Sequence, residues 1–406
     1  MLAFISFSCN TSKENQLIIW TDNTEIVSYV ELYNSLYEDA QAVVVYKAEP
    51  ASSLPPAKDE IKPDIIIGPW LKNSKTRKNF KTLDYLFEES SISHSSFYQQ
   101  IIDYGMMNNK QYLIPISFNL PMIVFNKKNE NLIESNHFLN LTQIRQIASN
   151  FNKKNQSNSY VSMGFAPSWN EDFLYLVTKL YETSYREKGN SFLWNNKNLQ
   201  NAVNFVKEWT STRNTDTTSE QNFQFRYLYM PKYRQVVSER CLFAYLTSNE
   251  FFTLKDAQVE NLSFRWIEQN HKIPVEDNLV CLGIYKNSNN VKKAEKFITW
   301  FVKEETQRRL IERTQNMKLD TKDFGIAGGF SSIKSVNEKI YPAYYRQLLG
   351  NLPAEEYITM PFILPYTWPS IKSRVIFPFL QESTNTSVES PETLENRILD
   401  WTKQSF

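Results

Sequence analysis

The chain has 406 residues, 41% of them hydrophobic, and its formal net charge at pH 7 is +1. This length exceeds what one ordinary hydrophobic core organises and is typical of two domains. The balanced charge gives no support for binding to nucleic acid or to an acidic polymer. Only 9 glycines are present, and no Gly-rich phosphate-binding motif occurs.

The chain contains few residues that bind metals or act as catalytic nucleophiles. Its only cysteines and histidines are Cys9, Cys241, Cys281, His94, His137 and His271. No two cysteines have the spacing of a zinc knuckle, and the isolated histidines do not support a zinc site or a Ser-His-Asp triad. We therefore expect no metal and no cofactor. In an oxidising compartment, Cys241 and Cys281 could form a disulfide bond.

The N-terminal segment Met1–Ser8 is apolar and is followed by Cys9 and a polar run, Asn10–Gln16. It is too short to span a bilayer. It resembles the end of a bacterial lipoprotein signal, in which small residues precede a cysteine that carries lipid after cleavage. The alternative is an apolar start without this role, because the basic residues that begin a secretory signal are missing.

The next segments predict an α/β lobe. Gln16–Trp20, Ala42–Tyr46 and Asp64–Gly68 are short apolar runs typical of buried strands. Between the first two, apolar residues recur at helical spacing from Ile26 to Leu36, after Asp22 or Thr24 as the cap. This alternation indicates a mostly parallel sheet, in which ligands bind beyond the carboxyl ends of the strands. Residues 20–23 and 68–70 should then share one rim.

Residues 111–128 (QYLIPISFNLPMIVFNKK) contain two apolar runs around the sequence Ser117-Phe118-Asn119. A helix is unlikely here because Pro115 and Pro121 lie six residues apart. We expect two buried strands joined by a kinked, partly polar crossing.

The rest of the chain alternates helices and strands. Helices are expected near residues 83–87, 97–105, 141–151, from 171, and at 199–209, 291–313 and 391–402. Strands are expected at 160–165, 242–246, 264–268 and 279–285. The Ser/Thr-rich run 210–221 is predicted to be a surface loop.

Three motifs in this order resemble one family. They are Lys110-x-Tyr112-x-Ile114-Pro115 followed by Ile123-Val124-Phe125-Asn126-Lys127, then Gly283-Ile284-x-Lys286-x-Ser288-Asn289 before Ala294 and Phe297, and Met360-Pro361 before Pro365 and Trp368. Over residues 16–403 the chain resembles extracellular solute-binding proteins of the maltose-binding-protein class. The resemblance implies a type II periplasmic binding-protein fold, with two α/β lobes, each a mixed sheet flanked by helices, and a ligand cleft between them.

The resemblance also implies a domain organisation and a function. A signal remnant and tether at 1–15 would precede an N-terminal lobe formed by 16–118 and 269–328, and a C-terminal lobe formed by 119–268 and 329–406. The protein would be the monomeric substrate-binding component of an ABC importer. It would deliver a neutral polar solute, most simply a sugar, to membrane permease subunits, and lipid on Cys9 would anchor it in the periplasm or at the cell surface.

Aromatic and polar residues near strand ends and helix starts are the predicted ligand contacts, because aromatic faces cover sugar rings and polar side chains bind hydroxyls. They are Trp20, Asp22, Asn23, Trp70, Phe118, Asn119, Trp169, Asn170, Asn249, Phe251 and Trp368. Asn119 stands where maltose-binding relatives have a carboxylate. An amide that caps the hinge is as reasonable an interpretation of Asn119 as a ligand contact.

Two other function classes remain open. A carbohydrate hydrolase would need two carboxylates across one bond, and Glu171-Asp172 and Glu355-Glu356 are the adjacent pairs. Neighbouring carboxylates on a helix point about 100° apart, which disfavours this use. The second class is a surface lipoprotein that keeps the fold but binds a protein partner or nothing.

Overall fold

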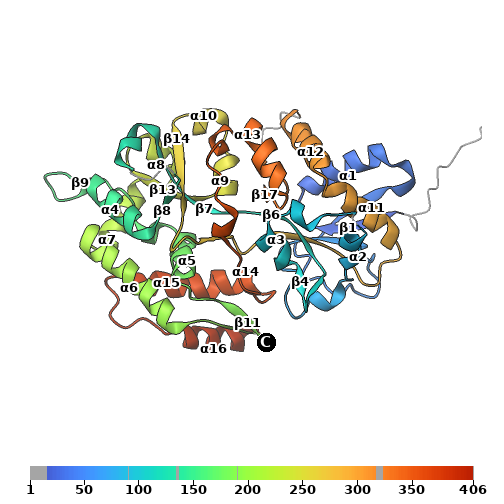
Figure 1. The fold of residues 1–406 in the computed structure, drawn as a ribbon. Coiled ribbons are helices and arrows are strands. Elements are labelled where there is room, and N and C mark those ends of the chain that lie inside the picture. The colour runs from blue at the N-terminus through green and yellow to red at the C-terminus, as the bar shows by residue number, and fades with distance from the viewer. Residues whose placement is uncertain (1–15, 90, 134–136, 190, 317–322, 406) are drawn as a thin grey trace, which may run out of the picture.

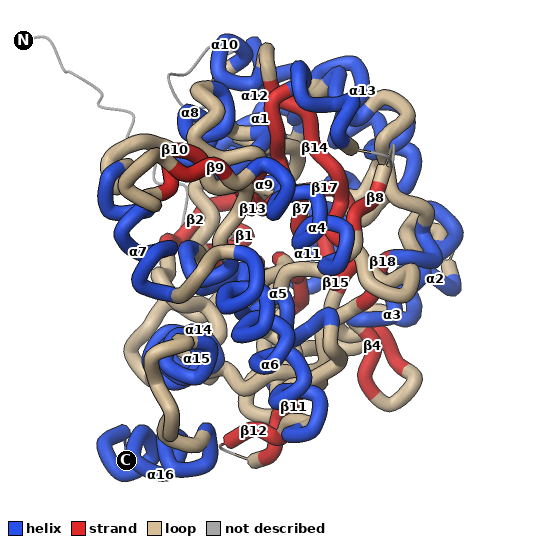
Figure 2. The backbone as a smooth tube through the Cα atoms, turned by 90° about the vertical axis from the view of Figure 1, so that its left-hand side faces the viewer, coloured by secondary structure: helices blue, strands red, loops and turns tan. Residues whose placement is uncertain are grey.

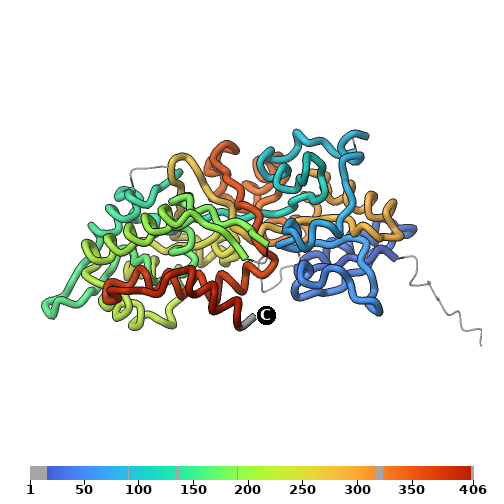
Figure 3. The backbone as a smooth tube through the Cα atoms, turned by 90° about the horizontal axis from the view of Figure 1, so that it is seen from below, coloured from blue at the N-terminus to red at the C-terminus, as the bar shows by residue number. Residues whose placement is uncertain are grey.

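The computed structural model describes residues 16–89, 91–133, 137–189, 191–316 and 323–405. Cys9 and the predicted tether lie outside these ranges. Within them, no helix has the length and apolar character needed to cross a bilayer. Two α/β lobes lie side by side (Figures 1 and 3), as the sequence predicts.

The first lobe is built on a six-stranded mixed sheet. Its order is β17 (Phe330–Ser331), β6 (Ile114–Phe118), β16 (Val280–Ile284), β3 (Ile65–Gly68), β1 (Leu17–Thr21) and β2 (Ala42–Tyr46). β1 runs parallel to β2 and β3, while β16 is antiparallel to both β3 and β6. Its helices are α1 (Glu25–Leu36), α2 (Asp84–Glu88), α3 (Gln99–Tyr104), α11 (Val291–Phe301) and α12 (Glu304–Asn316), and β4 (Met106–Met107) pairs with β5 (Lys110–Gln111).

The second lobe is built on a four-stranded sheet with the order β13 (Phe243–Thr247), β7 (Pro121–Asn126), β14 (Leu262–Ile267) and β8 (Phe138–Leu139). Its helices are α4 (Leu141–Phe151), α5 (Glu171–Leu180), α6 (Asn196–Arg213), α7 (Thr217–Arg226), α8 (Lys232–Val237), α9 (Ser248–Phe252), α10 (Asp256–Val259), α14 (Trp368–Ile371), α15 (Phe377–Thr384) and α16 (Leu394–Ser405). Two hairpins, β9 (Lys153–Lys154) with β10 (Tyr160–Ser162) and β11 (Arg186–Lys188) with β12 (Ser191–Leu193), complete it.

The chain passes between the lobes three times, from β6 to β7, from β14 to β16, and from β17 to α14. The last two crossings contain β15 (Ile273–Pro274) and β18 (Ile358–Thr359), which pair in parallel. The Glu276 N–H donates to the Asn119 carbonyl at 2.9 Å, and the Val275 N–H donates to the Thr359 carbonyl at 2.9 Å. The three crossings therefore lie side by side and form the hinge region.

The strand β7 shows how the sequence builds the second lobe. Successive side chains of a strand point to opposite faces. Met122 and Val124 accordingly join the core cluster that fills the first lobe, while Ile123 and Phe125 join the second lobe's own cluster with α5 and α6. The sheet is buried on both faces, and the first cluster continues across both lobes, where it also contains α13 (Tyr341–Tyr344).

Several predicted elements need correction. The run 210–221 is not a loop, because α6 extends through it to Arg213 and α7 begins at Thr217. The expected helix 291–313 is broken at Val302–Lys303 into α11 and α12. The strand β17, which the sequence prediction put in the second lobe, pairs with β6 of the first sheet.

The cysteine prediction is also corrected. Cys241 and Cys281 are both free and buried, in different lobes. Burial raises the pKa of each thiol to about 12. No disulfide joins them, and neither thiol is reactive at neutral pH.

Candidate functional site

A cavity of about 270 Å³ lies in the second lobe at the start of α5. It is lined by Phe165, Trp169, Asn170, Gln224, Tyr227, Leu228, Met230, Pro231, Lys232, Gln235, Cys241, Phe243, Ala244 and Tyr245. The walls come from the turn before α5, from the end of α7 and the start of α8, and from β13. We call it the Trp169 cavity.

The Trp169 side chain is held rigidly beside this cavity. Its indole Nε1 donates to the main-chain carbonyl of Glu220 at 2.9 Å. Its ring is stacked on Phe223, with centroids 5.4 Å apart and planes within 10°. Both contacts come from α7. The half-buried ring is therefore fixed in orientation, as an aromatic platform for a ligand has to be.

The local sequence explains the position of the platform. Pro167 begins a short helical turn, Pro167–Trp169, and the Asn170 side chain accepts a hydrogen bond from the Phe173 N–H at 3.1 Å. This cap residue directly follows Trp169, and α5 starts at Glu171. Asn170 also lines the cavity, but its side-chain oxygen is used by the cap, so mainly its amide N–H₂ is available to a ligand.

Tyr245 connects the Trp169 cavity with the hinge region. Its hydroxyl donates to Glu276 Oε1 at 3.4 Å, and its carbonyl accepts from Lys232 Nζ at 3.3 Å. Burial raises the pKa of the Glu276 carboxyl. A polar path therefore runs from the cavity wall to the second crossing.

The neighbouring Asp277 is part of a buried network. Its carboxylate forms an ion pair with Lys179 Nζ at 2.8 Å and accepts from the Tyr175 hydroxyl at 2.6 Å and from Trp368 Nε1 at 3.2 Å. Burial alone would raise the pKa of Asp277, but Lys179 and Lys372 hold it below its usual range. Asp277 therefore stays ionised and ties α5 and α14 to the second crossing.

The first-lobe rim brings Asp22, Asn23 and Gly68 together as expected. The Asp22 carboxylate lies 3.3 Å from the position that a Cβ on Gly68 would take. Thr24 is the N-cap of α1, as one of the two predicted residues, but its side chain makes no capping hydrogen bond; instead the Asn23 side chain accepts from the Glu25 N–H at 2.8 Å. Burial raises the pKa of the Asp22 carboxyl.

Asn119 has mainly structural contacts. Its Nδ2 donates to the Gly328 carbonyl at 2.9 Å, and its Oδ1 accepts from the Ser248 hydroxyl at 2.6 Å. The amide thus joins the first crossing to a first-lobe loop and to α9 of the second lobe, which supports the interpretation as a hinge amide. Asn249 is half-buried next to Gly328, on the second-lobe side.

Four predicted aromatic contacts are inside the core, namely Trp20, Phe118, Phe251 and Trp368, each at most 2% exposed. Their rings pack in the two large clusters and present no face to a ligand in this conformation. Trp70 is half-buried, has a φ of 63°, and packs against both clusters. It therefore bridges the lobes.

Sequence reasoning did not find Tyr227, Gln224, Gln235, Tyr245 or Glu276. Gln224 lies on α7, Tyr227 follows it and Gln235 lies on α8, whereas the Ser and Thr content of residues 210–221 predicts a loop there. The signal was present in Asp216, whose side chain accepts from the Ser219 N–H at 2.6 Å and starts the helix. Tyr245 lies in the predicted strand, but its hydroxyl direction is set by tertiary packing.

The carboxylate pairs suggested for hydrolysis have other contacts. Asp172 forms an ion pair with Lys372 at 2.8 Å. Glu355 forms one with Lys334 at 2.7 Å and caps the Gln99 N–H. One carboxylate of each pair, Asp172 or Glu355, therefore has a structural partner.

Many solved structures share this fold. The sugar-binding protein MalE from Xanthomonas citri matches with a TM-score of 0.66 at 11% identity, covering 96% of each chain. CpMnBP1 with bound mannotriose matches at 0.63 and 14%, covering 96% of this chain and 100% of that one. The GacH receptor of Streptomyces glaucescens, solved without ligand and with acarbose, matches at 0.63 and 12%, covering 96% and 97%.

The chain has the two-lobe fold of these binding proteins. No family model and no curated protein matches its sequence. At these identities the likeness establishes the architecture, and the ligand has to be argued from this chain's own residues.

Proposed function

We propose that the protein is the solute-binding component of an ABC importer, that it binds a neutral sugar or oligosaccharide in a cleft that closes on the solute, and that the Trp169 cavity is the second lobe's share of this site. The observation that carries this proposal is the Trp169 cavity, where a fixed aromatic ring stands among polar side chains. An aromatic face covers the apolar C–H side of a sugar ring, and amides and hydroxyls bind its edge. The fold shared with sugar-binding proteins supports the same interpretation.

The polar groups of the cavity favour an uncharged solute. Asn170, Gln224 and Gln235 carry amides, which both donate and accept hydrogen bonds, as sugar hydroxyls do. Among the described residues of the lining, Lys232 is the one charged side chain, and Glu250 lies 3.8 Å from its Nζ. Since Glu250 neutralises Lys232, the lining offers no free charge that would attract a charged solute.

Lobe rotation about the three crossings would close the cleft on the solute. A ligand favours closure only by its higher affinity for the closed state. Apart from the hydrophobic core that they share, the lobes touch through Ser74, whose N–H and hydroxyl donate to the Glu187 carboxylate at 3.0 and 2.7 Å, and through Lys75, which lies 3.9 Å from the Tyr366 ring centroid. These exposed contacts are weak enough to exchange during such a motion.

The cellular arrangement follows from the same proposal. The protein would be a monomer outside the cytoplasmic membrane, anchored by lipid on Cys9, and would deliver its solute to permease subunits. No chemical step on the solute is proposed.

Isothermal titration with a panel of mono- and oligosaccharides tests the function. We expect one solute to bind and to raise the melting temperature by mass action. Trp169→Ala should abolish binding. Trp401→Ala is the matched control, because Trp401 is a partly buried tryptophan in α16, away from the cavity, and should leave affinity unchanged. Equal affinity of both variants would contradict the site, and no binding by any sugar would contradict the function.

A protein partner is the second candidate, favoured by one observation. Phe225, Leu228 and Tyr229 are exposed beside the cavity mouth, Tyr229 to 96%. Exposed apolar side chains gathered at one place often mark an interaction site. A photo-crosslinking residue at position 229 should then give a protein adduct on intact cells, whereas the solute proposal expects crosslinking to be absent or to be lost when the sugar is added.

A further inference from the structure

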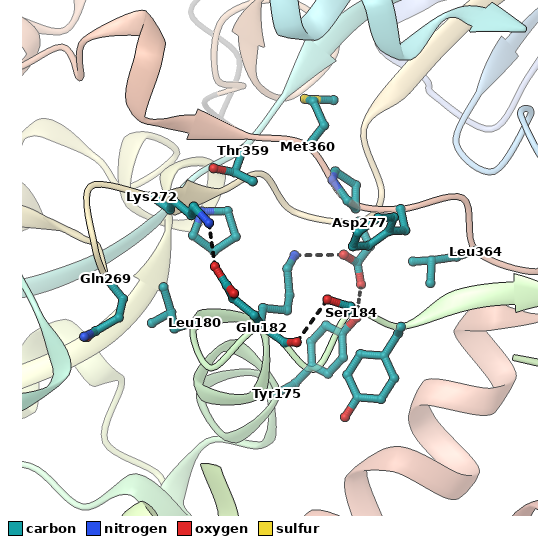
Figure 4. Close-up of a pocket in the computed structure, with 15 residues that line it drawn as sticks. Tyr175, Leu180, Glu182, Ser184, Gln269, Lys272, Asp277, Thr359, Met360 and Leu364 are labelled. Carbon is teal, nitrogen blue, oxygen red and sulfur yellow. Dashed lines mark hydrogen bonds and ion pairs between the residues drawn. The ribbon is translucent and has the colours of Figure 1, made fainter. Parts of the chain in front are cut away.

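The charged side chains at the hinge region are paired with one another. A cavity of about 300 Å³ lies there, and Figure 4 shows the pairing of Lys179 with Asp277 and of Lys272 with Glu182 in its lining. The Asp277 carboxylate also accepts a hydrogen bond from the Tyr175 hydroxyl at 2.6 Å. The charges at this place therefore cancel, and the hinge region offers a charged partner nothing to neutralise.

The outer end of the second lobe is different. α7 and α8 lie at this end, away from the first lobe (Figure 1), and Figure 2 shows the molecule from this side. Between the two helices, Phe225, Leu228 and Tyr229 are exposed, and Tyr229 is exposed to 96%. We call these three side chains the exposed tip. Because Tyr229 projects almost completely into solvent, the exposed tip is a projection of the surface and not a groove.

The backbone that carries the exposed tip is held in place. The Met230 N–H donates to the Tyr227 carbonyl at 2.8 Å, and Gln235 Nε2 of α8 donates to the Met230 carbonyl at 2.8 Å. The Tyr227 ring packs on the buried Phe223 ring, with centroids 5.1 Å apart. A partner that binds the exposed tip therefore has little backbone to order, which lowers the entropic cost of binding.

Three exposed arginines, Arg226, Arg234 and Arg240, surround the exposed tip. The guanidinium carbon of Arg226 lies 5.7 Å from the Phe223 ring centroid, and that of Arg240 lies 5.6 Å from the Tyr227 ring centroid. Arg234 is in the first turn of α8. None of the three forms an ion pair with another residue that the structure describes.

Acidic side chains do not balance these arginines. Residues 221–238 contain no Asp and no Glu. Glu239, which precedes Arg240 in the chain, is paired with Lys128 at 2.7 Å. The formal net charge of the whole chain is only +1, so the positive charge around the exposed tip is a local feature.

We propose that the exposed tip binds the surface of an anionic lipid bilayer. Phe225, Leu228 and Tyr229 enter the head-group region, where the apolar ring and polar hydroxyl of a tyrosine are both accommodated, and the arginines contact lipid phosphates. A protein partner would have to supply both a pocket for the projecting side chains and three carboxylates, whereas an anionic bilayer supplies both kinds of contact over any part of its surface. This inference rests neither on the sugar site nor on lipid at Cys9.

Co-sedimentation with lipid vesicles tests the charge contacts. The full chain carries Cys9→Ser throughout, so that lipid on this residue cannot contribute. It should bind vesicles of equal parts phosphatidylcholine and phosphatidylglycerol, bind phosphatidylcholine alone much more weakly, and lose affinity at raised ionic strength. Arg226→Gln combined with Arg234→Gln should weaken binding by about fivefold for each charge, or roughly 25-fold together.

A second arginine pair is the matched control for net charge. Arg308→Gln combined with Arg309→Gln changes the net charge by the same amount, but both residues lie on α12 in the first lobe. This control should leave vesicle binding unchanged. Equal effects of the two pairs would show that overall charge and not the exposed tip attracts the vesicles.

An environment-sensitive fluorophore tests whether the exposed tip itself enters the bilayer. It can be attached to Tyr229→Cys or, as a control, to Tyr46→Cys, which replaces a tyrosine exposed to 63% at the end of β2 in the first lobe. The buried thiols of Cys241 and Cys281 should not react. Anionic vesicles should increase the emission and shift it to the blue at position 229 and leave position 46 unchanged.

The proposal is overturned if anionic vesicles do not bind the chain, if the two arginine pairs have equal effects, or if the fluorophore at position 229 does not respond. A photo-crosslinking residue at position 229 should give a lipid adduct on intact cells. A protein adduct without a lipid adduct would also overturn the proposal, in favour of a protein partner.

Discussion

Glu220 holds the Trp169 ring in place. Its carboxyl is fully buried and accepts hydrogen bonds from the Ser168 hydroxyl and from Asn214 Nδ2, the latter at 2.7 Å. Its main-chain carbonyl holds the Trp169 indole. Burial raises the pKa of Glu220 to about 7, because its neutral hydrogen-bond donors only partly replace the lost hydration. A titrating group therefore sits directly under the proposed sugar platform.

The raised pKa of Glu220 makes stability depend on pH. In the unfolded chain this carboxyl ionises with its ordinary pKa of 4.5, whereas the folded protein keeps it protonated up to about 7. The folded state is therefore favoured by protonation, and stability falls as pH rises from 4.5 through 7, by roughly 3 kcal/mol. Glu220→Gln imitates the neutral form and should reduce the fall by this amount in urea denaturation series at pH 5 and 8; the contribution of Glu25, whose burial also raises its pKa to about 7, should remain. An unchanged pH dependence in the variant would contradict it.

Single residues also show where sequence reasoning ends. The residue types around a sugar site could be predicted, and Trp169 and Asn170 do line a cavity. Trp20 and Trp368 follow the same positional rule but are buried, because position next to a strand or helix end does not fix where a ring points. The Trp368 indole N–H donates to the buried Asp277 carboxylate, which lies nearly a hundred residues earlier in the chain. No local sequence pattern indicates such a pair.

The loop 324–330 is the element that meets both lobes. Gly328 has a φ of 74°, and its carbonyl accepts from Asn119. A Cβ on Gly328 would lie 3.7 Å from Asn249 Nδ2, in the second lobe, and 3.8 Å from Glu25 Oε1, in the first. These are ordinary contact distances, so an added side chain would not clash with its neighbours. It would be strained because the backbone at Gly328 has a positive φ.

Gly328→Ala should cost about 1 kcal/mol of stability through this backbone strain. Gly189→Ala is the matched control, because Gly189 has a φ of 57° and no described atom within 4 Å of the added Cβ. We expect similar losses in the free energy of unfolding for both. Since only Gly328 of the two lies between the lobes, only its variant should change the affinity for the sugar. Loss of affinity in the Gly189 variant, or none in the Gly328 variant, would argue against a cleft at this place.

Elements were easier to predict than their contacts. Strands buried on both faces appear as apolar runs, and helices such as α4 follow a clear 3.6-residue period, so both could be found from the sequence. The helix α7 was missed because its exposed Ser, Thr and Gln residues resemble a loop, although Phe223 and Glu220 are fully buried. The break at Val302–Lys303 was missed because the apolar period runs on through it.

At the scale of the whole molecule, the two lobes share a core. The cluster that fills the first lobe also contains Met122, Leu246, Phe252 and Trp266 of the second. Rings of the two parts are in direct contact, as between Trp266 and Phe330 with centroids 5.9 Å apart. Neither lobe can lose its packing without exposing apolar surface of the other.

The protein should therefore unfold in one cooperative step. Calorimetry should give a single transition in which the calorimetric and van't Hoff enthalpies agree. Two separate transitions, one for each lobe, would show that the shared cluster does not couple them.

The order of strands in the first sheet determines when the first lobe can fold during synthesis. β16 lies between β6 and β3, yet Val280–Ile284 is made long after both. Until that segment has emerged, β3 and β6 have no partner between them, and the sheet has a gap at its centre. The part of the protein that is made first therefore completes its fold late. This delay would suit the export across a membrane that the proposed function requires.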